Sequence, residues 1–190
     1  MSFYKQQLRD YLKKVDIRGG HVLSIGAEHD DREYFKSCEV ERWKTMDISQ
    51  QFNPDILFNM NVQVMEDDGD LKIEYENLEA YDFVFAFELW EYIYDPLTAH
   101  KNIYQLLANG GTYMGSYPFV YGKHNPAGQD YLRYTDDGIR KLLTLAKFRD
   151  IEIIPRISET SLTAFYVNEG MRIRKEVDHD IVGYIVKARK

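Results

Sequence analysis

Short apolar runs, each about as long as one buried strand, alternate along the chain with segments whose apolar residues recur at helical spacing. The strongest run, Tyr81 to Phe87, is apolar on both faces after Asp82, as is typical of a central parallel strand buried between helix layers. Another run, His21 to Ile25, ends at Gly26, where a strand can turn sharply because glycine has no side chain to clash. The same pattern predicts further strands at 41–47, 55–59, 112–117, 151–154 and 181–187.

Helices are predicted between these strands. Apolar positions at helical spacing predict an amphipathic helix over residues 3–15. Pro96 opens a second helix, 97–107, and Asn109-Gly110-Gly111 is expected to stop it with a left-handed cap. Thr135 is the expected N-cap of a third helix. That third helix spans 135–146, and shorter helices are expected over 30–37 and 71–78.

The alternation of strands and helices defines the expected fold class, because such alternation is typical of a parallel sheet wound in both directions. We predict an α/β protein with a doubly wound, Rossmann-like, seven-stranded and mostly parallel sheet, helices on both faces and an antiparallel last hairpin. The 190 residues suffice for one well-buried domain. Within it we expect an N-terminal helix in 1–18, an α/β core over 20–155 and a terminal hairpin region over 156–190.

Composition narrows the possible partners. The net charge of −7 argues against a large footprint on nucleic acid, which needs clustered Lys and Arg. No apolar run approaches the roughly 18 to 20 residues that span a bilayer, so no membrane contact is expected. Cys38 is the only cysteine, which excludes disulfides within one chain and fits a cytoplasmic setting. Residues 1–7 are polar, and no signal peptide is expected there.

Candidate chemistry lies at the carboxyl ends of the predicted strands. The chain has no phosphate-binding loop of the GxxxxGK[ST] type, no HExxH helix and no GxSxG elbow, and its five histidines lack ligand spacing, so no metal site is predicted. Asp47 closes the second strand, 21 positions after Gly26, and a carboxylate there suits ribose because it accepts from both vicinal hydroxyls. A solvent-facing turn aspartate is an equally open interpretation.

Taken in order, these motifs give the chain a resemblance to the class I S-adenosylmethionine-dependent methyltransferases, in the group that acts on small molecules. Residues 22–27 resemble the first motif of that family, Asp47 its ribose-binding acid and Gly110-Gly111 its glycine turn. Further similar segments are 54–61 around the adenine, 82–96 at the fourth strand and 118–148 on the acceptor side.

The resemblance implies S-adenosylmethionine as cofactor and a small-molecule acceptor as partner. The implied cofactor-binding residues are Gly26, Ala27, Glu28, Asp47, Ile48, Asn59, Met60, Phe87 and Glu88. His124, with an ordinary pKa near 6.5, is the candidate catalytic base. The candidate acceptor-binding residues are Tyr121, Asp130, Arg133 and Tyr134; Asp130 and Arg133 can instead pair to shape their loop, and the tyrosines can simply pack.

The sequence also departs from the family pattern. Ser24 stands where an acid is usual, Glu28 and Asp30 replace glycines, and Asn59, which can accept through its carbonyl, replaces an aspartate that meets the adenine amino group. The preferred hypothesis is an enzyme that methylates a small polar acceptor, with oxygen favoured. The alternative is a degenerate cofactor-binding domain that acts through a partner. A nicotinamide-dependent oxidoreductase would need a GxGxxG turn that this chain lacks.

Overall fold

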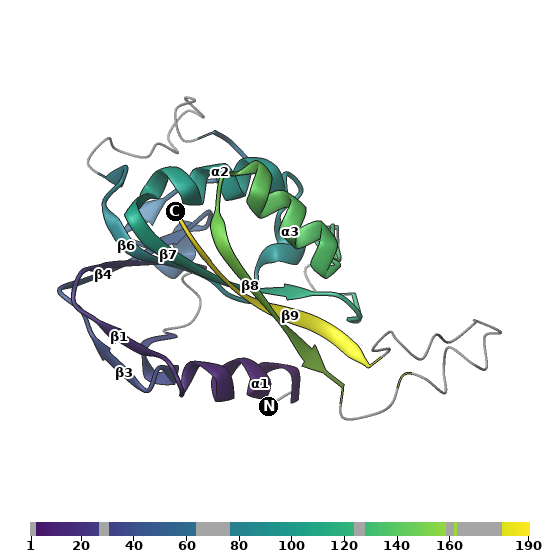
Figure 1. The fold of residues 1–190 in the computed structure, drawn as a ribbon. Helices are drawn as coiled ribbons and strands as arrows, with labels where there is room; N and C mark the ends of the chain where they lie inside the picture. Colours follow the sequence, from purple (N-terminus) through teal and green to yellow (C-terminus); the bar gives the residue numbers. More distant parts are fainter. Residues whose placement is uncertain (1–2, 27–30, 64–76, 124–127, 159–161, 163–179) are drawn as a thin grey trace.

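The computed structural model describes residues 3–26, 31–63, 77–123, 128–158, 162 and 180–190, and its centre is a seven-stranded sheet (Figure 1). The strand order is β5-β4-β2-β6-β7-β9-β8, parallel from β5 to β7 and antiparallel in the two pairings of β9. The predicted fold class, with its antiparallel last hairpin, is confirmed. The strands are β2 His21–Ile25, β4 Arg42–Asp47, β5 Ile56–Leu57, β6 Tyr81–Ala86, β7 Leu107–Pro118, β8 Arg149–Ile157 and β9 Ile181–Arg189.

Helices cover both faces of this sheet (Figure 1). The helices α2 (Pro96–Leu106) and α3 (Asp136–Leu145) lie on one face, and α1 (Phe3–Leu12) lies on the other. Strand β6 serves both cores, because successive side chains of a strand point to opposite faces: Val84 packs in the cluster with the α2 and α3 residues, and Phe85 in the cluster with α1. As predicted, Thr135 caps α3, with its Oγ1 accepting from Gly138 N at 3.1 Å.

The helix predicted over 30–37 is wrong in its described part. The chain forms a 3-10 turn, η1 (Asp31–Tyr34), and a short strand, β3 (Ser37–Glu39), which pairs in parallel with β1 (Asp16–Arg18). Phe35 is buried beside Phe85, with ring centroids 5.0 Å apart, and Lys36 N donates to the carbonyls of Leu12 and Val15. These contacts tie the segment to the end of α1, which covers this face of the sheet.

The predicted glycine cap of α2 is also wrong. The helix ends at Leu106, and Leu107 is already extended, so the Asn109-Gly110-Gly111 segment lies inside β7. There it forms an irregularity in the pairing with β6, with Gly110 at φ +79°, and Lys190 N donates to Gly111 O at 3.0 Å. The hydrogen bond from Lys190, the residue after β9, therefore keeps this segment in the sheet. The 71–78 helix falls mostly outside the described residues.

Candidate functional site

The register of the parallel strands brings several predicted site residues to one edge of the sheet. Ile25 pairs with Met46 on one side and with Ala86 on the other, so Gly26, Asp47 and Phe87 follow at the same level. Gly26 N also donates to Met46 O at 2.8 Å. In doubly wound sheets the crevice at the carboxyl ends of the strands is where ligands bind.

Gly26 marks the sharp turn at the end of β2. Its φ of +96° lies in the region that favours glycine. A Cβ there would lie 3.6 Å from Leu89 Cδ2, an ordinary contact, so the backbone conformation rather than lack of space calls for glycine. The turn after β6 therefore lies directly beside the turn after β2. The next two predicted residues, Ala27 and Glu28, lie outside the described residues.

A carboxylate and an exposed apolar side chain stand together at the end of β4. Asp47 is half-buried, and its Oδ1 accepts from Ser49 N at 2.8 Å. Ile48, the next residue, is 58% exposed. The pair therefore offers an acceptor for hydroxyl groups beside an apolar surface on which a planar ring can lie.

Asn59, after β5, was expected to accept from the adenine amino group through its side-chain carbonyl, but that carbonyl is already used within the chain. Its Oδ1 accepts from Asn61 N at 3.0 Å and from Asn61 Nδ2 at 3.1 Å, which uses both lone pairs of the carbonyl oxygen. The amide nitrogen is therefore the group left to meet a ligand. Asn61 Oδ1 in turn accepts from Tyr94 N and Asp95 N, both at 2.9 Å, and this fixes the segment against the start of α2.

Met60 and Phe87 contribute their backbones rather than their side chains to this edge. Met60 is 5% exposed and packs in the α2-side cluster, while its carbonyl accepts from Asn102 Nδ2 at 3.1 Å. Phe87 is 8% exposed and stacks on Phe85 in the α1-side cluster. Their assignment to cofactor binding stays a prediction, limited to main-chain contact.

Glu88, the next residue after Phe87, is held by a pair that sequence reasoning missed. Its Oε1 accepts from Ser116 Oγ and from Arg156 Nη1, each at 2.6 Å. Arg156 lies on β8, 68 positions away in sequence, and both of these partners are 0% exposed. The only sequence signal is a single arginine in the otherwise apolar end of a strand.

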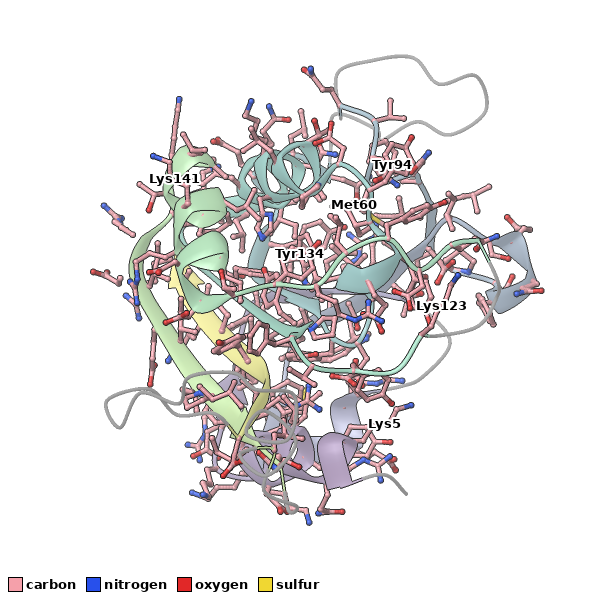
Figure 2. The ribbon with its side chains drawn as sticks, turned by 90° about the vertical axis from the view of Figure 1, so that its right-hand side faces the viewer. Lys5, Met60, Tyr94, Lys123, Tyr134 and Lys141 are labelled. Carbon is pink, nitrogen blue, oxygen red and sulfur yellow. The ribbon has the colours of Figure 1, made fainter. Side chains whose placement is uncertain are left out.

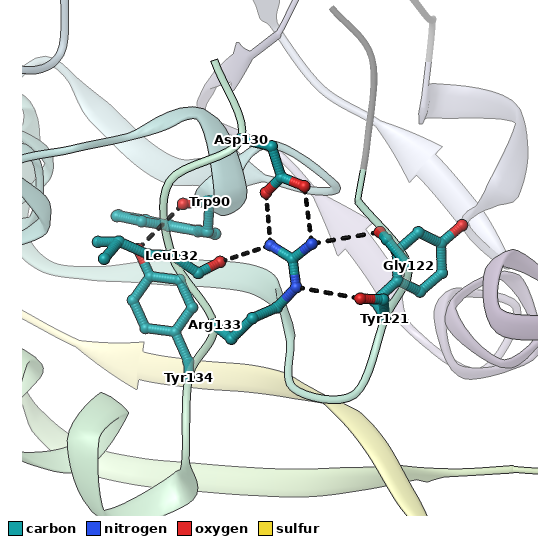
Figure 3. Close-up of polar contacts among 7 residues, drawn as sticks. All are labelled: Trp90, Tyr121, Gly122, Asp130, Leu132, Arg133 and Tyr134. Carbon is teal, nitrogen blue, oxygen red and sulfur yellow. Dashed lines mark hydrogen bonds and ion pairs between the residues drawn. The ribbon is translucent and has the colours of Figure 1, made fainter. Parts of the chain in front are cut away.

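In the segment that the sequence predicts to contact the acceptor, Arg133 clamps two stretches of the chain together (Figure 3). Its Nη1 donates to Asp130 Oδ1 at 2.5 Å and Leu132 O at 2.8 Å, and its Nη2 to Asp130 Oδ2 at 2.7 Å and Gly122 O at 3.2 Å. Its Nε donates to Tyr121 O at 3.4 Å. All five N–H donors of the guanidinium thus have partners within the chain. This geometry favours the loop-shaping interpretation of the pair.

The clamp gives a testable expectation. Arg133→Lys should lower the free energy of unfolding by about 1–2 kcal/mol, because an ammonium cannot reproduce the planar, bidentate geometry. Urea denaturation followed by circular dichroism measures this. Arg140→Lys is the matched control, since Arg140 makes one 3.2 Å bond, to Ile151 O, from the surface of α3. Equal losses in both variants would show that the clamp contributes nothing special.

The other predicted acceptor-side residues are not gathered into one open site. Tyr134 is 5% exposed, and its hydroxyl donates to Trp90 O at 2.9 Å (Figure 3). Figure 2 shows Tyr134 near the middle of the molecule in that view, and Lys123, at the end of the preceding described segment, is exposed. Tyr121 is half-buried, with its carbonyl in the Arg133 clamp. His124, the candidate base, lies outside the described residues, so its role stays a prediction.

A buried aromatic cluster lies under the turn that follows β6. Trp90 stacks on His100 at 4.1 Å and on Tyr117 at 4.9 Å between ring centroids. His100 Nδ1 lies 2.5 Å from Pro96 O and must donate to it, so in the neutral ring Nε2 accepts from the Tyr117 hydroxyl 2.7 Å away. Burial lowers the pKa of His100 to about 4 and raises the pKa of Tyr117 well above its usual value. The cluster is therefore neutral and structural.

Two further findings concern the described residues alone. No three His, Cys, Asp or Glu side chains among them are grouped so that they could hold a metal ion. In the same part of the chain, no helix is long and apolar enough to cross a membrane.

Comparison with known proteins places the fold. No protein-family model matches the chain, and a search of curated proteins finds no match. Among solved structures, an S-adenosylmethionine-dependent methyltransferase from Mesorhizobium loti matches with a TM-score of 0.64 and 13% identity over 98% of each chain. The [4+2]-cyclase SpnF matches with a TM-score of 0.60 and 15% identity, over 97% of this chain and 80% of that one.

Phosphoethanolamine N-methyltransferase 2 from Haemonchus contortus, in complex with S-adenosyl-L-methionine, matches all of this chain with a TM-score of 0.58 and 13% identity. The chain spans only 53% of that enzyme's length. The sheet order and these likenesses agree: the protein has the fold of the class I S-adenosylmethionine-dependent methyltransferases.

Proposed function

We propose that the protein binds S-adenosylmethionine and transfers its methyl group to a small polar acceptor, preferably to an oxygen atom. The observation that carries the proposal is the group at the ends of β2 and β4, where Gly26 turns at φ +96° beside Asp47 and the 58% exposed Ile48. Two neighbouring hydroxyls suit the carboxylate of Asp47, and an adenine ring suits the apolar surface of Ile48. These residues therefore fit the nucleoside part of the cofactor.

In this proposal the order of strands sets the direction of the cofactor along the carboxyl edge of the sheet. We assign Asn59 after β5 to the adenine, Asp47 after β4 to the ribose and Gly26 after β2 to the methionine part. When bound, the cofactor would supply a methyl group on a positively charged sulfur: the acceptor oxygen would bond to the methyl carbon in line as the carbon–sulfur bond breaks to leave a neutral sulfur, and the acceptor's proton would pass to a base. The chain's own work is to orient the acceptor and exclude water.

The small polar acceptor is supported by one likeness and by the proposed site's position. The Haemonchus contortus enzyme, which this chain resembles over about half of that enzyme's length, acts on phosphoethanolamine. In this chain the segments that Arg133 clamps follow the end of β7, and β7 is the neighbour of β6 in the sheet. Oxygen as the acceptor atom follows from the sequence resemblance and stays a proposal.

Asp47→Ala tests cofactor binding. We expect calorimetric titration to show S-adenosylmethionine and S-adenosylhomocysteine binding to the unchanged chain, and the variant to bind both about 30-fold more weakly, because charge-assisted hydrogen bonds to the ribose are lost. Asp10→Ala, on the surface of α1, is the control and should bind normally. No heat with either ligand for the unchanged chain would overturn the proposal.

A second candidate function is cofactor binding without methyl transfer. Ser24 stands on β2 where the resembling family has an acid, and among the described residues its Oγ is buried with no hydrogen-bond partner. The SpnF likeness shows that the fold also occurs in a protein described as a cyclase. Binding of S-adenosylmethionine without release of S-adenosylhomocysteine on a panel of hydroxylated and amino acceptors would favour this candidate.

A further inference from the structure

The Glu88 carboxylate is fixed through one oxygen and open at the other. Oε1 accepts from both Ser116 Oγ and Arg156 Nη1, and the side chain keeps 21% of its surface exposed. Among the described residues, Oε2 has no hydrogen-bond partner. A carboxylate held in this way presents its second oxygen in a set direction to whatever occupies the crevice.

The backbone of Glu88 is held in an unfavourable conformation. Its φ of +53° lies in the left-handed region, which costs a non-glycine residue on the order of 1 kcal/mol. Glu88 N donates to Ser116 Oγ at 2.8 Å, and the same hydroxyl donates to Oε1. Ser116 therefore fixes both the main chain and the side chain of Glu88. Strain that is retained at the ligand edge of a sheet is a reason to look for function there.

Arg156 reaches Glu88 across the width of the hairpin. In the register, Arg156 of β8 pairs with Gly183 of β9, and Gly183 pairs with Pro118 of β7. Paired residues project from the same face of a sheet, and glycine at position 183 places no side chain beside Arg156 on that face. A fully buried guanidinium is costly unless it is paired, so its contact with Glu88 is a built feature of the fold.

The position of Glu88 follows from the strand order. Along the edge come Asn59, Asp47, Gly26 and then Glu88, on β5, β4, β2 and β6. Strands β4 and β6 lie on either side of β2, so the Asp47 and Glu88 segments are about 10 Å apart. A cofactor whose ribose meets Asp47 and whose methionine part meets Gly26 has its sulfur next to Glu88. This step rests on the proposed function.

We propose that Glu88 Oε2 lies at the point of methyl transfer, where it binds the O–H or N–H group of the acceptor, and that Arg156 is the positioning residue that aims it. A carboxylate accepts from such donors and favours positive charge, and its bonds to charged groups are the stronger ones. The acceptor is thus a hydrogen-bond donor at the atom that receives the methyl group. An acceptor whose nucleophile is a bare carbon does not use this feature.

Two cofactor analogues test the proposal without knowledge of the acceptor. Sinefungin carries an amino group, on carbon, in place of the methyl group on the sulfonium of S-adenosylmethionine, whereas S-adenosylhomocysteine has a neutral sulfur without that methyl group. We expect the unchanged chain to bind sinefungin more tightly than S-adenosylhomocysteine. Glu88→Gln should reduce the ratio of the sinefungin affinity to the S-adenosylhomocysteine affinity about tenfold, with little change in the affinity for S-adenosylhomocysteine. Glutamine retains the shape and one oxygen acceptor for Ser116 and Arg156. Glu41→Gln, on an exposed glutamate before β4, is the matched control.

Arg156→Met is expected to reduce the same ratio of affinities, and Arg156→Lys should reduce it less. If Arg156→Met does not fold, Ser116→Ala takes its place and is expected to reduce the ratio as well. A merely structural role would lower the melting temperature and weaken both analogues alike. An unchanged ratio in Glu88→Gln would overturn the placement of Glu88. A changed ratio there, with no change in the Arg156 and Ser116 variants, would overturn the positioning role. If the unchanged chain binds neither analogue, the proposed function itself fails.

Discussion

Replacing Trp90 by alanine is expected to lower the free energy of unfolding by about 4 kcal/mol, the largest effect of any single substitution considered for this chain. Trp90 is 1% exposed and heads the fully buried side chains in volume. Its ring stacks on both His100 and Tyr117, and each such aromatic contact adds about 0.5–1.5 kcal/mol beyond the area that it buries. The cavity left in a close-packed core accounts for the remainder.

Urea denaturation at neutral pH, followed by far-ultraviolet circular dichroism, measures the loss. Trp90→Phe keeps a ring between the two neighbours and should cost less than half as much. Tyr94→Ala, at a side chain 58% exposed, should change stability by less than about 0.5 kcal/mol. A loss below about 1.5 kcal/mol for Trp90→Ala would mean that the cluster collapses around the gap and does not depend on the indole.

The main strands of this fold could be predicted because local pattern and tertiary environment agree there. The run from Tyr81 to Phe87 is apolar on both faces, and the structure buries Val84 and Phe85 in opposite clusters. Thr135 could be predicted as a cap because its hydroxyl bonds to a backbone group three residues away. Such interactions are local, so the sequence contains the whole of each one.

Predictions failed where a distant segment decides the local structure. The residues after Asp31 have helical character, but β1 supplies a parallel partner for Ser37–Glu39, and α1 already covers that face. Gly110-Gly111 resembles a helix cap, but pairing with the chain end at Lys190 keeps it in β7. In both cases tertiary hydrogen bonds outweigh a preference of a few tenths of a kcal/mol per residue.

The candidate site divides in the same way. The edge residues Gly26 and Asp47 could be anticipated, since the ends of parallel strands meet in any doubly wound sheet. The partner of Glu88 could not, because Arg156 reaches it only through the register of two antiparallel pairings. The role of Arg133 was open in the sequence for a related reason: three of its five donors bond to backbone carbonyls, and every residue has one.

The protein is expected to lose about 3 kcal/mol of stability between pH 7 and pH 4 through His100 alone. His100 is fully buried and neutral, and burial lowers its pKa to about 4, against an ordinary value near 6.5. Between these two values the unfolded chain binds a proton that the folded chain does not. Stability therefore falls as the pH falls, and the contribution is fully present only above the unfolded pKa.

His100→Gln removes the titrating ring, so the difference between the two stability curves isolates this contribution from the carboxylates that titrate in the same range. Urea denaturation at several pH values should give curves that converge as the pH falls from 7 to 4. The hydroxyl of Tyr117 and that of Tyr113, 2.7 Å from it, stay protonated throughout because burial raises the pKa of each. Parallel curves would contradict this prediction, because they would mean that the folded chain binds the proton as readily as the unfolded chain. The bond that Nε2 accepts from the Tyr117 hydroxyl opposes this, since an imidazolium has no acceptor.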